Sequence, residues 1–116
     1  MLNHKKQNAM KYYAETLETT RRGYGWGIYL TDNKESIIEK GLTPIEVLVQ
    51  DLKTVEPGSE EYNEKVYPKL PGSDGGMPFM NDMNLAAVAA GFNSYKIELM
   101  DCRLLVIYDR NCIVKN

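Results

Sequence analysis

Histidine and cysteine are scarce in this sequence, and their scarcity narrows the chemistry open to it. Among 116 residues there is one histidine, His4, and there are two cysteines, Cys102 and Cys112. A histidine-rich zinc site is excluded, and so is a Ser-His-Asp or Cys-His catalytic arrangement that does not use His4. Two cysteines are too few for a disulfide scaffold, and they lack Cys-x-x-Cys spacing. We therefore expect reduced structural thiols, no metal site and a cytoplasmic protein.

An excess of charge of one sign and a long apolar run are also missing. The 14 Lys and Arg residues nearly balance the 16 Asp and Glu residues, which leaves a formal net charge of -2. A protein that binds nucleic acid regardless of sequence needs a strongly basic surface, so no direct nucleic-acid partner is expected. No apolar run approaches the ~20 residues that span a bilayer, and the polar residues 1–8 do not resemble a secretory signal. No membrane partner is expected.

The composition is otherwise that of a folded globular chain. Apolar residues make up 43% of the sequence, and its length suits one hydrophobic core, so we expect a single domain over residues 1–116. Periodicity and turn residues predict helices and strands in an irregular order. The predicted elements are a helix over 8–22, a strand at 28–31, a helix over 33–40, a strand over 45–52, a short helix over 59–66, a long loop over 68–78, a helix over 83–90, and strands over 95–99, 104–108 and 112–115. For 45–52 a helix is the alternative, because a capping-box spacing and a proline precede it. The order favours an α+β fold, with a mixed or antiparallel sheet flanked by short helices.

A segment rich in glycine and aromatic residues follows the first predicted helix. Residues 23–31 read Gly-Tyr-Gly-Trp-Gly-Ile-Tyr-Leu-Thr. A dinucleotide fingerprint needs a strand before its glycines and a helix directly after them, whereas the predicted order here is the reverse. A phosphate-binding P-loop is excluded, because the chain has no Gly-Lys-Ser or Gly-Lys-Thr. The glycines therefore indicate neither of these two nucleotide sites.

A different resemblance accounts for this segment and for three later ones. Residues 25–32, followed by a short helix and a glycine, resemble the second motif of the ADP-ribosyltransferase fold, which diphtheria-toxin-type transferases and poly-ADP-ribose polymerases share. Residues 45–57 resemble the family's next strand and lysine-containing turn. Residues 84–94 are similar to its small-residue helix ending in Gly-aromatic, and residues 104–109 to its hydrophobic strand ending in aromatic-Asp. The resemblance implies a small ADP-ribosyltransferase-like α+β domain with NAD as its cofactor.

The resemblance also implies residues that contact NAD. Tyr29 corresponds to the tyrosine that stacks on the nicotinamide ring, and Gly25, Gly27 and Thr31 belong to the same motif. The family's first motif is a strand ending in His or Arg that holds the ribose and amide of NAD. His4 lies at about the right distance before Tyr29 and is the candidate for that catalytic and cofactor-binding position. The alternative for Tyr29 is an ordinary core residue, and for the glycines it is a purely backbone role.

The catalytic carboxylate is the second implied feature. In the family a glutamate near the start of the last long strand stabilises the positive charge that develops on the ribose as nicotinamide leaves. Alignment of residues 104–109 with that strand puts Leu104 at the glutamate position. The nearest carboxylates, Asp101 and Glu98, are therefore the candidates, with solvated surface carboxylates as the alternative. Arg103 is a candidate for binding the NAD pyrophosphate, and so are Arg21 and Arg22 just before the glycines; for all three the alternative is a surface position.

Taken together, these features predict a small NAD-dependent mono-ADP-ribosyltransferase-like protein that modifies a host protein. Its size resembles that of phage proteins that block host machinery, which implies an anti-defence role such as that of an anti-CRISPR factor, in the cytoplasm of the host cell. The alternative is a non-catalytic inhibitor or interaction module that keeps the fold and binds a host protein, and the leucine at position 104 favours it. A third possibility is a domain unrelated to NAD, in which the glycines only shape a turn.

Overall fold

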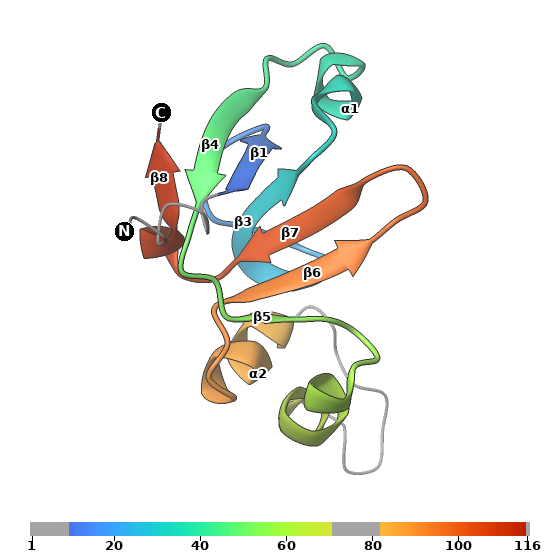
Figure 1. Cartoon of the computed structure of the whole chain (residues 1–116), viewed down its shortest axis with the longest axis vertical. Helices are drawn as coiled ribbons and strands as arrows, with labels where there is room; N and C mark the ends of the chain where they lie inside the picture. The colour runs from blue at the N-terminus through green and yellow to red at the C-terminus, as the bar shows by residue number, and fades with distance from the viewer. Residues whose placement is uncertain (1–9, 71–81, 116) are drawn as a thin grey trace, which may run out of the picture.

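A mixed sheet with short helices packed around it forms the structure (Figure 1). The computed structural model describes residues 10–70 and 82–115. The strands among these residues are β1 Met10–Ala14, β2 Thr20–Arg22, β3 Gly25–Thr31, β4 Ile45–Val49, β5 Thr54–Val55, β6 Ser94–Glu98, β7 Arg103–Ile107 and β8 Ile113–Lys115. The helical elements are α1 Lys34–Ile38, α2 Met83–Ala89, a π-helical turn Tyr62–Val66, and 3-10 turns Tyr67–Lys69 and Arg110–Cys112. The predicted α+β class is confirmed.

The glycine-aromatic segment forms the central strand of the sheet. The strand order is β5-β6-β7-β3-β1-β4-β8, and β2 pairs with β3 outside this path. The paired strands are antiparallel except for β5 and β6, which are parallel. In this register Thr31 of β3 lies opposite Leu104 of β7 on one side and opposite Tyr13 of β1 on the other. Residues far apart in the sequence therefore meet at the end of β3.

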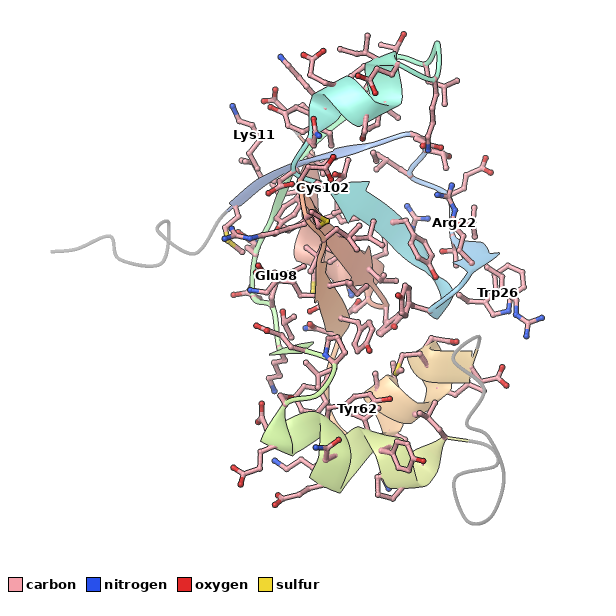
Figure 2. All side chains as sticks on the ribbon, turned by 90° about the vertical axis from the view of Figure 1, so that its right-hand side faces the viewer. Lys11, Arg22, Trp26, Tyr62, Glu98 and Cys102 are labelled. Carbon is pink, nitrogen blue, oxygen red and sulfur yellow. The ribbon has the colours of Figure 1, made fainter. Side chains whose placement is uncertain are left out.

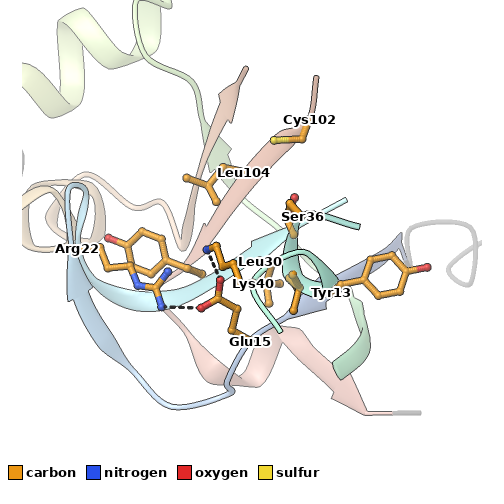
Figure 3. A pocket seen from close by; sticks show the side chains of 11 residues that line it. Tyr13, Glu15, Arg22, Leu30, Ser36, Lys40, Cys102 and Leu104 are labelled. Carbon is orange, nitrogen blue, oxygen red and sulfur yellow. Dashed lines mark hydrogen bonds and ion pairs between the residues drawn. The ribbon is translucent and has the colours of Figure 1, made fainter. Parts of the chain in front are cut away.

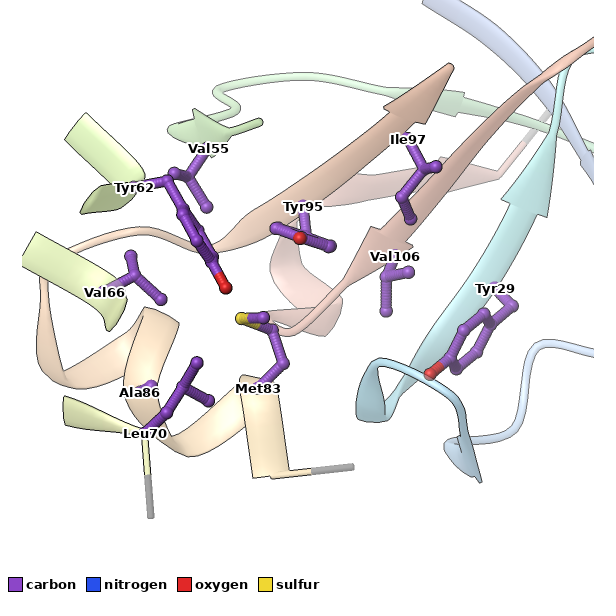
Figure 4. Packing of buried hydrophobic residues seen from close by; sticks show 10 residues of the cluster. All are labelled: Tyr29, Val55, Tyr62, Val66, Leu70, Met83, Ala86, Tyr95, Ile97 and Val106. Atoms are coloured by element: carbon purple, nitrogen blue, oxygen red, sulfur yellow. The ribbon is translucent and has the colours of Figure 1, made fainter. Parts of the chain in front are cut away.

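Two hydrophobic cores lie on opposite faces of β3 and β7. Successive side chains of a strand point to opposite faces, so Tyr29 and Val106 join one core while Ile28 and Leu105 join the other. The first core, drawn in Figure 4, packs the sheet against α2 and the helical turns; its buried members are Tyr29, Val55, Tyr62, Val66, Leu70, Met83, Ala86, Tyr95, Ile97 and Val106. The second is built mainly from β1, β3, β4 and β7. Both faces of β3 are buried, so its sequence reads as an almost continuous apolar run.

The helix predicted over 8–22 is wrong. The described part of this segment forms β1, a connection, and then β2. In β1 burial alternates with a period of two, since Tyr12 and Ala14 are buried while Lys11 is exposed. Strands β3 and β4 flank β1 and complete its backbone hydrogen bonds on both sides. Long-range pairing overrides the local helical spacing here, as tertiary context often does.

Most other predicted elements are confirmed with small shifts in their bounds. The strand predicted over 45–52 is β4, so the helical alternative is wrong. The short helix predicted after the glycine-aromatic segment is α1, whose N-cap is Asn33. The predicted loop 68–78 begins inside a 3-10 turn, and its remainder from 71 onward lies outside the described residues. Among the described helices, none is long and apolar enough to span a membrane.

Candidate functional site

Tyr29, the predicted nicotinamide contact, is fixed inside the protein by its own segment. Its side chain is 8% exposed. The phenol donates a hydrogen bond of 2.6 Å to the Gly25 carbonyl and accepts one of 3.1 Å from the Tyr24 backbone N–H. Burial raises the pKa of the phenol, so it is protonated at neutral pH. The hydroxyl of Tyr29 thus has a structural role. The Tyr29 side chain also lines a cavity.

That cavity has a volume of about 130 Å³ and lies between the end of β3, α1 and the start of β7 (Figure 3). It is lined by Tyr13, Glu15, Arg22, Tyr29, Leu30, Thr31, Ser36, Ile37, Lys40, Cys102 and Leu104. We call it the Tyr29 cavity. The Arg22 guanidinium lies 5.2 Å from the centre of the Tyr29 ring, a cation–π contact that covers one face of the ring. Cofactor sites commonly enclose about 300–1,000 Å³, so the Tyr29 cavity is too small for a dinucleotide as it stands.

Glu15 is the carboxylate in the Tyr29 cavity. Lys40 hydrogen-bonds one of its oxygens, and the Arg22 guanidinium lies 3.6 Å from the other (Figure 3). The hydrogen bond from Lys40, together with the charges of Lys40 and Arg22, lowers the pKa of Glu15 below its ordinary 4.5. Sequence analysis missed Glu15 because it lay within a predicted helix, and no local signal marked it. Strand pairing and α1 bring the three charges together.

Leu104 also lines the Tyr29 cavity. It lies in β7 opposite Thr31 of β3, only two residues along β3 from Tyr29. This is the position at which the resemblance to ADP-ribosyltransferases, stated above as an expectation, would put a catalytic glutamate. The side chain that faces the cavity from β7 is therefore aliphatic and cannot accept a hydrogen bond or carry charge.

Asp101 and Glu98, the predicted catalytic carboxylates, line a different cavity. That cavity, of about 320 Å³, lies at the hairpin between β6 and β7 and is lined by Asp32, Glu98, Leu99, Asp101, Cys102 and Arg103. Glu98 pairs with the Arg103 side chain at 3.2 Å, and Asp32 accepts the Arg103 backbone N–H at 2.8 Å. Neither Asp101 nor Glu98 lines the Tyr29 cavity. The structure thus brings the two acids together but separates them from Tyr29, and Cys102 lines both cavities.

The other predicted residues of the motif have structural explanations. A Cβ on Gly27 would lie 2.7 Å from Val106 Cγ1 and 2.9 Å from the Ile107 carbonyl oxygen, so glycine permits the close approach of β3 and β7. Gly25 adopts φ of 94°, a conformation that favours glycine. The Thr31 hydroxyl accepts the Asn33 backbone N–H at 3.1 Å at the start of α1. His4 lies outside the described residues.

An exposed apolar surface lies beside the first hydrophobic core. Trp26 is 52% exposed, and its indole projects from the edge of the molecule in Figure 2. Its backbone N–H donates to the Asn84 side chain at 3.1 Å, which joins β3 to α2. On α2, Leu85 is 63% exposed and Val88, three residues later on the same side of the helix, is 54% exposed. We call Trp26, Leu85 and Val88 the Trp26 surface.

Comparison with models of protein families, with curated proteins and with solved structures finds no significant match. In the described part of the chain, no group of three or more His, Cys, Asp or Glu side chains is placed to hold a metal ion. The chemistry of the described residues is therefore the basis on which function is argued.

Proposed function

We propose that this protein is a non-catalytic interaction module that binds a host protein through its surface. The observation that carries the proposal is the position of Leu104. From the resemblance to ADP-ribosyltransferases, a glutamate is expected at this position, where its carboxylate would stabilise the positive charge on the ribose. Leu104 lines the same cavity as Tyr29, so an aliphatic side chain stands there instead.

The Trp26 surface is the part of the molecule best suited to a protein partner. Tryptophan is enriched among the residues that dominate binding energies, because it buries a large area when a partner covers it. Leu85 and Val88, on the helix whose Asn84 side chain accepts the Trp26 backbone N–H, are also exposed. Exposed apolar side chains that form one contiguous patch mark protein contact surfaces.

Affinity capture from a bacterial host extract tests the proposal. The tagged protein is expected to retain one or a few proteins, and the Trp26→Ser variant is expected to lose them. Met100→Ser is the matched control, because Met100 is also exposed but lies at the β6–β7 hairpin. Equal capture by the wild-type protein and the Trp26→Ser variant would contradict a role for this surface. Labelling of an extract protein from labelled NAD, dependent on the added chain, would contradict the non-catalytic assignment.

One observation favours a second candidate, an NAD-dependent mono-ADP-ribosyltransferase. Glu15 is an ionised carboxylate in the Tyr29 cavity, and Arg22 adjoins it. In that reaction the bond between nicotinamide and the ribose carbon breaks, nicotinamide leaves with the bonding electrons, and an acceptor side chain forms the new bond. Glu15 would stabilise the positive ribose. This candidate predicts labelling that Glu15→Gln abolishes and that Glu98→Gln and Asp101→Asn leave intact.

A further inference from the structure

A third cavity lies at the opposite end of β7 from the Tyr29 cavity. It has a volume of about 480 Å³ and is lined by Lys53, Val88, Gly91, Phe92, Asn93, Tyr108, Asp109 and Arg110. We call it the Phe92 cavity. Its volume falls within the range of about 300–1,000 Å³ that is usual for binding sites. Val88 belongs to both the Phe92 cavity and the Trp26 surface, so the two are continuous.

Backbone hydrogen bonds hold the walls of the Phe92 cavity in place. The Asn93 side chain accepts the Lys53 N–H at 2.7 Å and donates to the Asp51 carbonyl at 3.1 Å. The Asn93 carbonyl accepts the Tyr108 N–H at 2.8 Å. Three separate segments are thereby tied together around one amide residue. A site with fixed walls loses little conformational freedom when a ligand enters, which favours binding.

The polar groups left available in the Phe92 cavity are mainly cationic. The structure gives the Lys53 ammonium no ion pair within residues 10–70 and 82–115, and Arg110 uses one of its nitrogens to donate to the Leu17 carbonyl at 2.9 Å. One oxygen of Asp109 accepts the Asn111 N–H at 3.0 Å, and the Tyr108 hydroxyl donates to the Tyr24 carbonyl at 2.9 Å. Two cations and one carboxylate leave the lining with an excess of positive charge.

The remaining wall of the cavity is apolar. Val88 is 54% exposed, and Phe92 is partly buried against the first hydrophobic core. A ligand that complements both walls of the cavity needs an apolar side chain to pack against Val88 and Phe92. It also needs a carboxylate to pair with Lys53 and Arg110. A guanidinium and an ammonium attract carboxylates, and Arg can bind them with two hydrogen bonds.

We propose that the Phe92 cavity binds a peptide segment of the partner protein in which an apolar side chain adjoins an acidic one. This assignment rests on the proposed function and specifies the chemistry of its partner. The partner's segment lies across α2, with its apolar side chain between Val88 and Phe92 and its carboxylate toward Lys53. The rest of the partner covers the Trp26 surface, which continues from Val88.

Titration of the full, isotope-labelled chain with short peptides, followed by amide NMR shifts, tests the assignment. The capped peptide Asp-Leu-Phe-Glu is expected to shift the amides of Val88, Phe92, Asn93 and Arg110. The capped peptide Lys-Leu-Phe-Lys, with the same apolar core and opposite charge, is expected to leave them in place. Equal shifts with both peptides, or shifts confined to other parts of the chain, would overturn the assignment. The same shifts with adenosine monophosphate at lower concentration would also overturn it, in favour of a nucleotide.

Two charge-reversal variants test whether Lys53 is the cation that binds the carboxylate of the peptide. Lys53→Glu is expected to weaken binding of the acidic peptide about fivefold, the upper end for an exposed ion pair. Lys34→Glu makes the same charge change on α1, away from the cavity, and is expected to bind as the wild-type protein does. Unchanged binding by Lys53→Glu would overturn the assignment.

The two proposals fail separately. Capture of a host protein that depends on Trp26 but not on Lys53 would overturn the Phe92 cavity assignment and leave the proposed function intact. Binding of the acidic peptide by a chain that captures no host protein would contradict the proposed function, while the cavity's preference for acidic peptides would be supported.

Discussion

The phenol of Tyr29 donates its proton to the carbonyl of Gly25, four residues earlier in the same strand. This hydrogen bond joins the residue proposed as a nicotinamide contact to the residue that opens β3. A buried backbone carbonyl needs a hydrogen-bond donor, and the Tyr29 phenol supplies one to the carbonyl of Gly25. The tyrosine therefore helps to build the strand on which it lies, whatever ligand its ring meets.

Removal of the Tyr29 hydroxyl is expected to destabilise the protein. Tyr29→Phe leaves the Gly25 carbonyl without this donor and the Tyr24 N–H without this acceptor, and should lower the free energy of unfolding by about 1–2 kcal/mol. Tyr13→Phe is the matched control, because Tyr13 also lines this cavity and the structure gives its hydroxyl no hydrogen bond among the described residues. Urea denaturation of both variants measures the difference. Equal midpoints would contradict the structural role of the phenol.

Gly27 is expected to tolerate no side chain. Gly27→Ala puts a methyl group 2.7 Å from Val106 Cγ1 and 2.9 Å from a backbone oxygen, so β3 and β7 must separate. We expect a loss of about 1–3 kcal/mol in the free energy of unfolding, as for other overpacked cores. At Gly23 an added Cβ meets no atom within 4 Å, and Gly23→Ala should change stability by less than about 0.5 kcal/mol. Thermal unfolding of the pair is the measurement, and a similar melting temperature for both would show that β7 can yield.

Two tyrosines of the first hydrophobic core, the buried Tyr95 and the partly buried Tyr108, should respond in opposite directions to loss of their hydroxyl groups. The Tyr95 hydroxyl is buried and has no hydrogen-bond partner among the described residues, whereas the Tyr108 hydroxyl donates to the Tyr24 carbonyl at 2.9 Å. Tyr95→Phe should keep or raise stability, by up to about 1 kcal/mol, because an unpaired polar group is removed. Tyr108→Phe should lower it by about 1 kcal/mol. Chemical denaturation that ranks the two variants in the reverse order would contradict this hydrogen-bond assignment.

Glu15 is expected to make stability depend on acid pH. Lys40 and Arg22 lower its pKa in the folded protein below the ordinary 4.5, so folding favours the ionised form. The resulting stabilisation is fully present above an unfolded-state pKa of about 4.5 and is lost as the pH falls through the lower folded-state pKa. Glu15→Gln should therefore flatten the acid side of the stability profile, while Glu39→Gln on α1 should leave its slope unchanged. Parallel profiles for the wild-type protein and Glu15→Gln would remove Glu15 from this role.

Several elements could be predicted because their signals are local. The helix α2 is rich in alanine and is followed by Gly91, and in β4 the β-branched Ile45, Val47 and Val49 alternate with Glu46 and Leu48, so each segment carries its own preference. The strand β1 could not be predicted in the same way. Its spacing suits one face of a helix, and only its pairing with β3 and β4 shows that it is extended. Strand pairing of this kind joins residues distant in sequence, which a local window does not contain.

The candidate site shows the same division. The glycine-aromatic segment indicated Tyr29 as a candidate site residue. The alignment of residues 104–109 with the family's last long strand put Leu104 at the position of the catalytic glutamate, and in the structure Leu104 of β7 lines the Tyr29 cavity. The carboxylates nearest in sequence, Asp101 and Glu98, lie in another cavity, because Glu98 ends β6 and Asp101 lies in the hairpin that precedes β7. Proximity along the chain is a poor guide near a hairpin, where one residue's step reverses the face of a strand.

The amino-acid sequence alone indicates a nearly neutral α+β chain with one histidine and an apolar strand that follows a glycine-aromatic segment. The tertiary structure establishes which groups share a cavity. Glu15, Arg22 and Lys40 line one cavity with Tyr29, while Lys53, Phe92 and Arg110 line another at the other end of β7. Composition and local propensity act within a few residues, whereas the sheet register and the turn after α2 bring separate segments together. The neighbours that give a side chain its chemistry are therefore set by the fold.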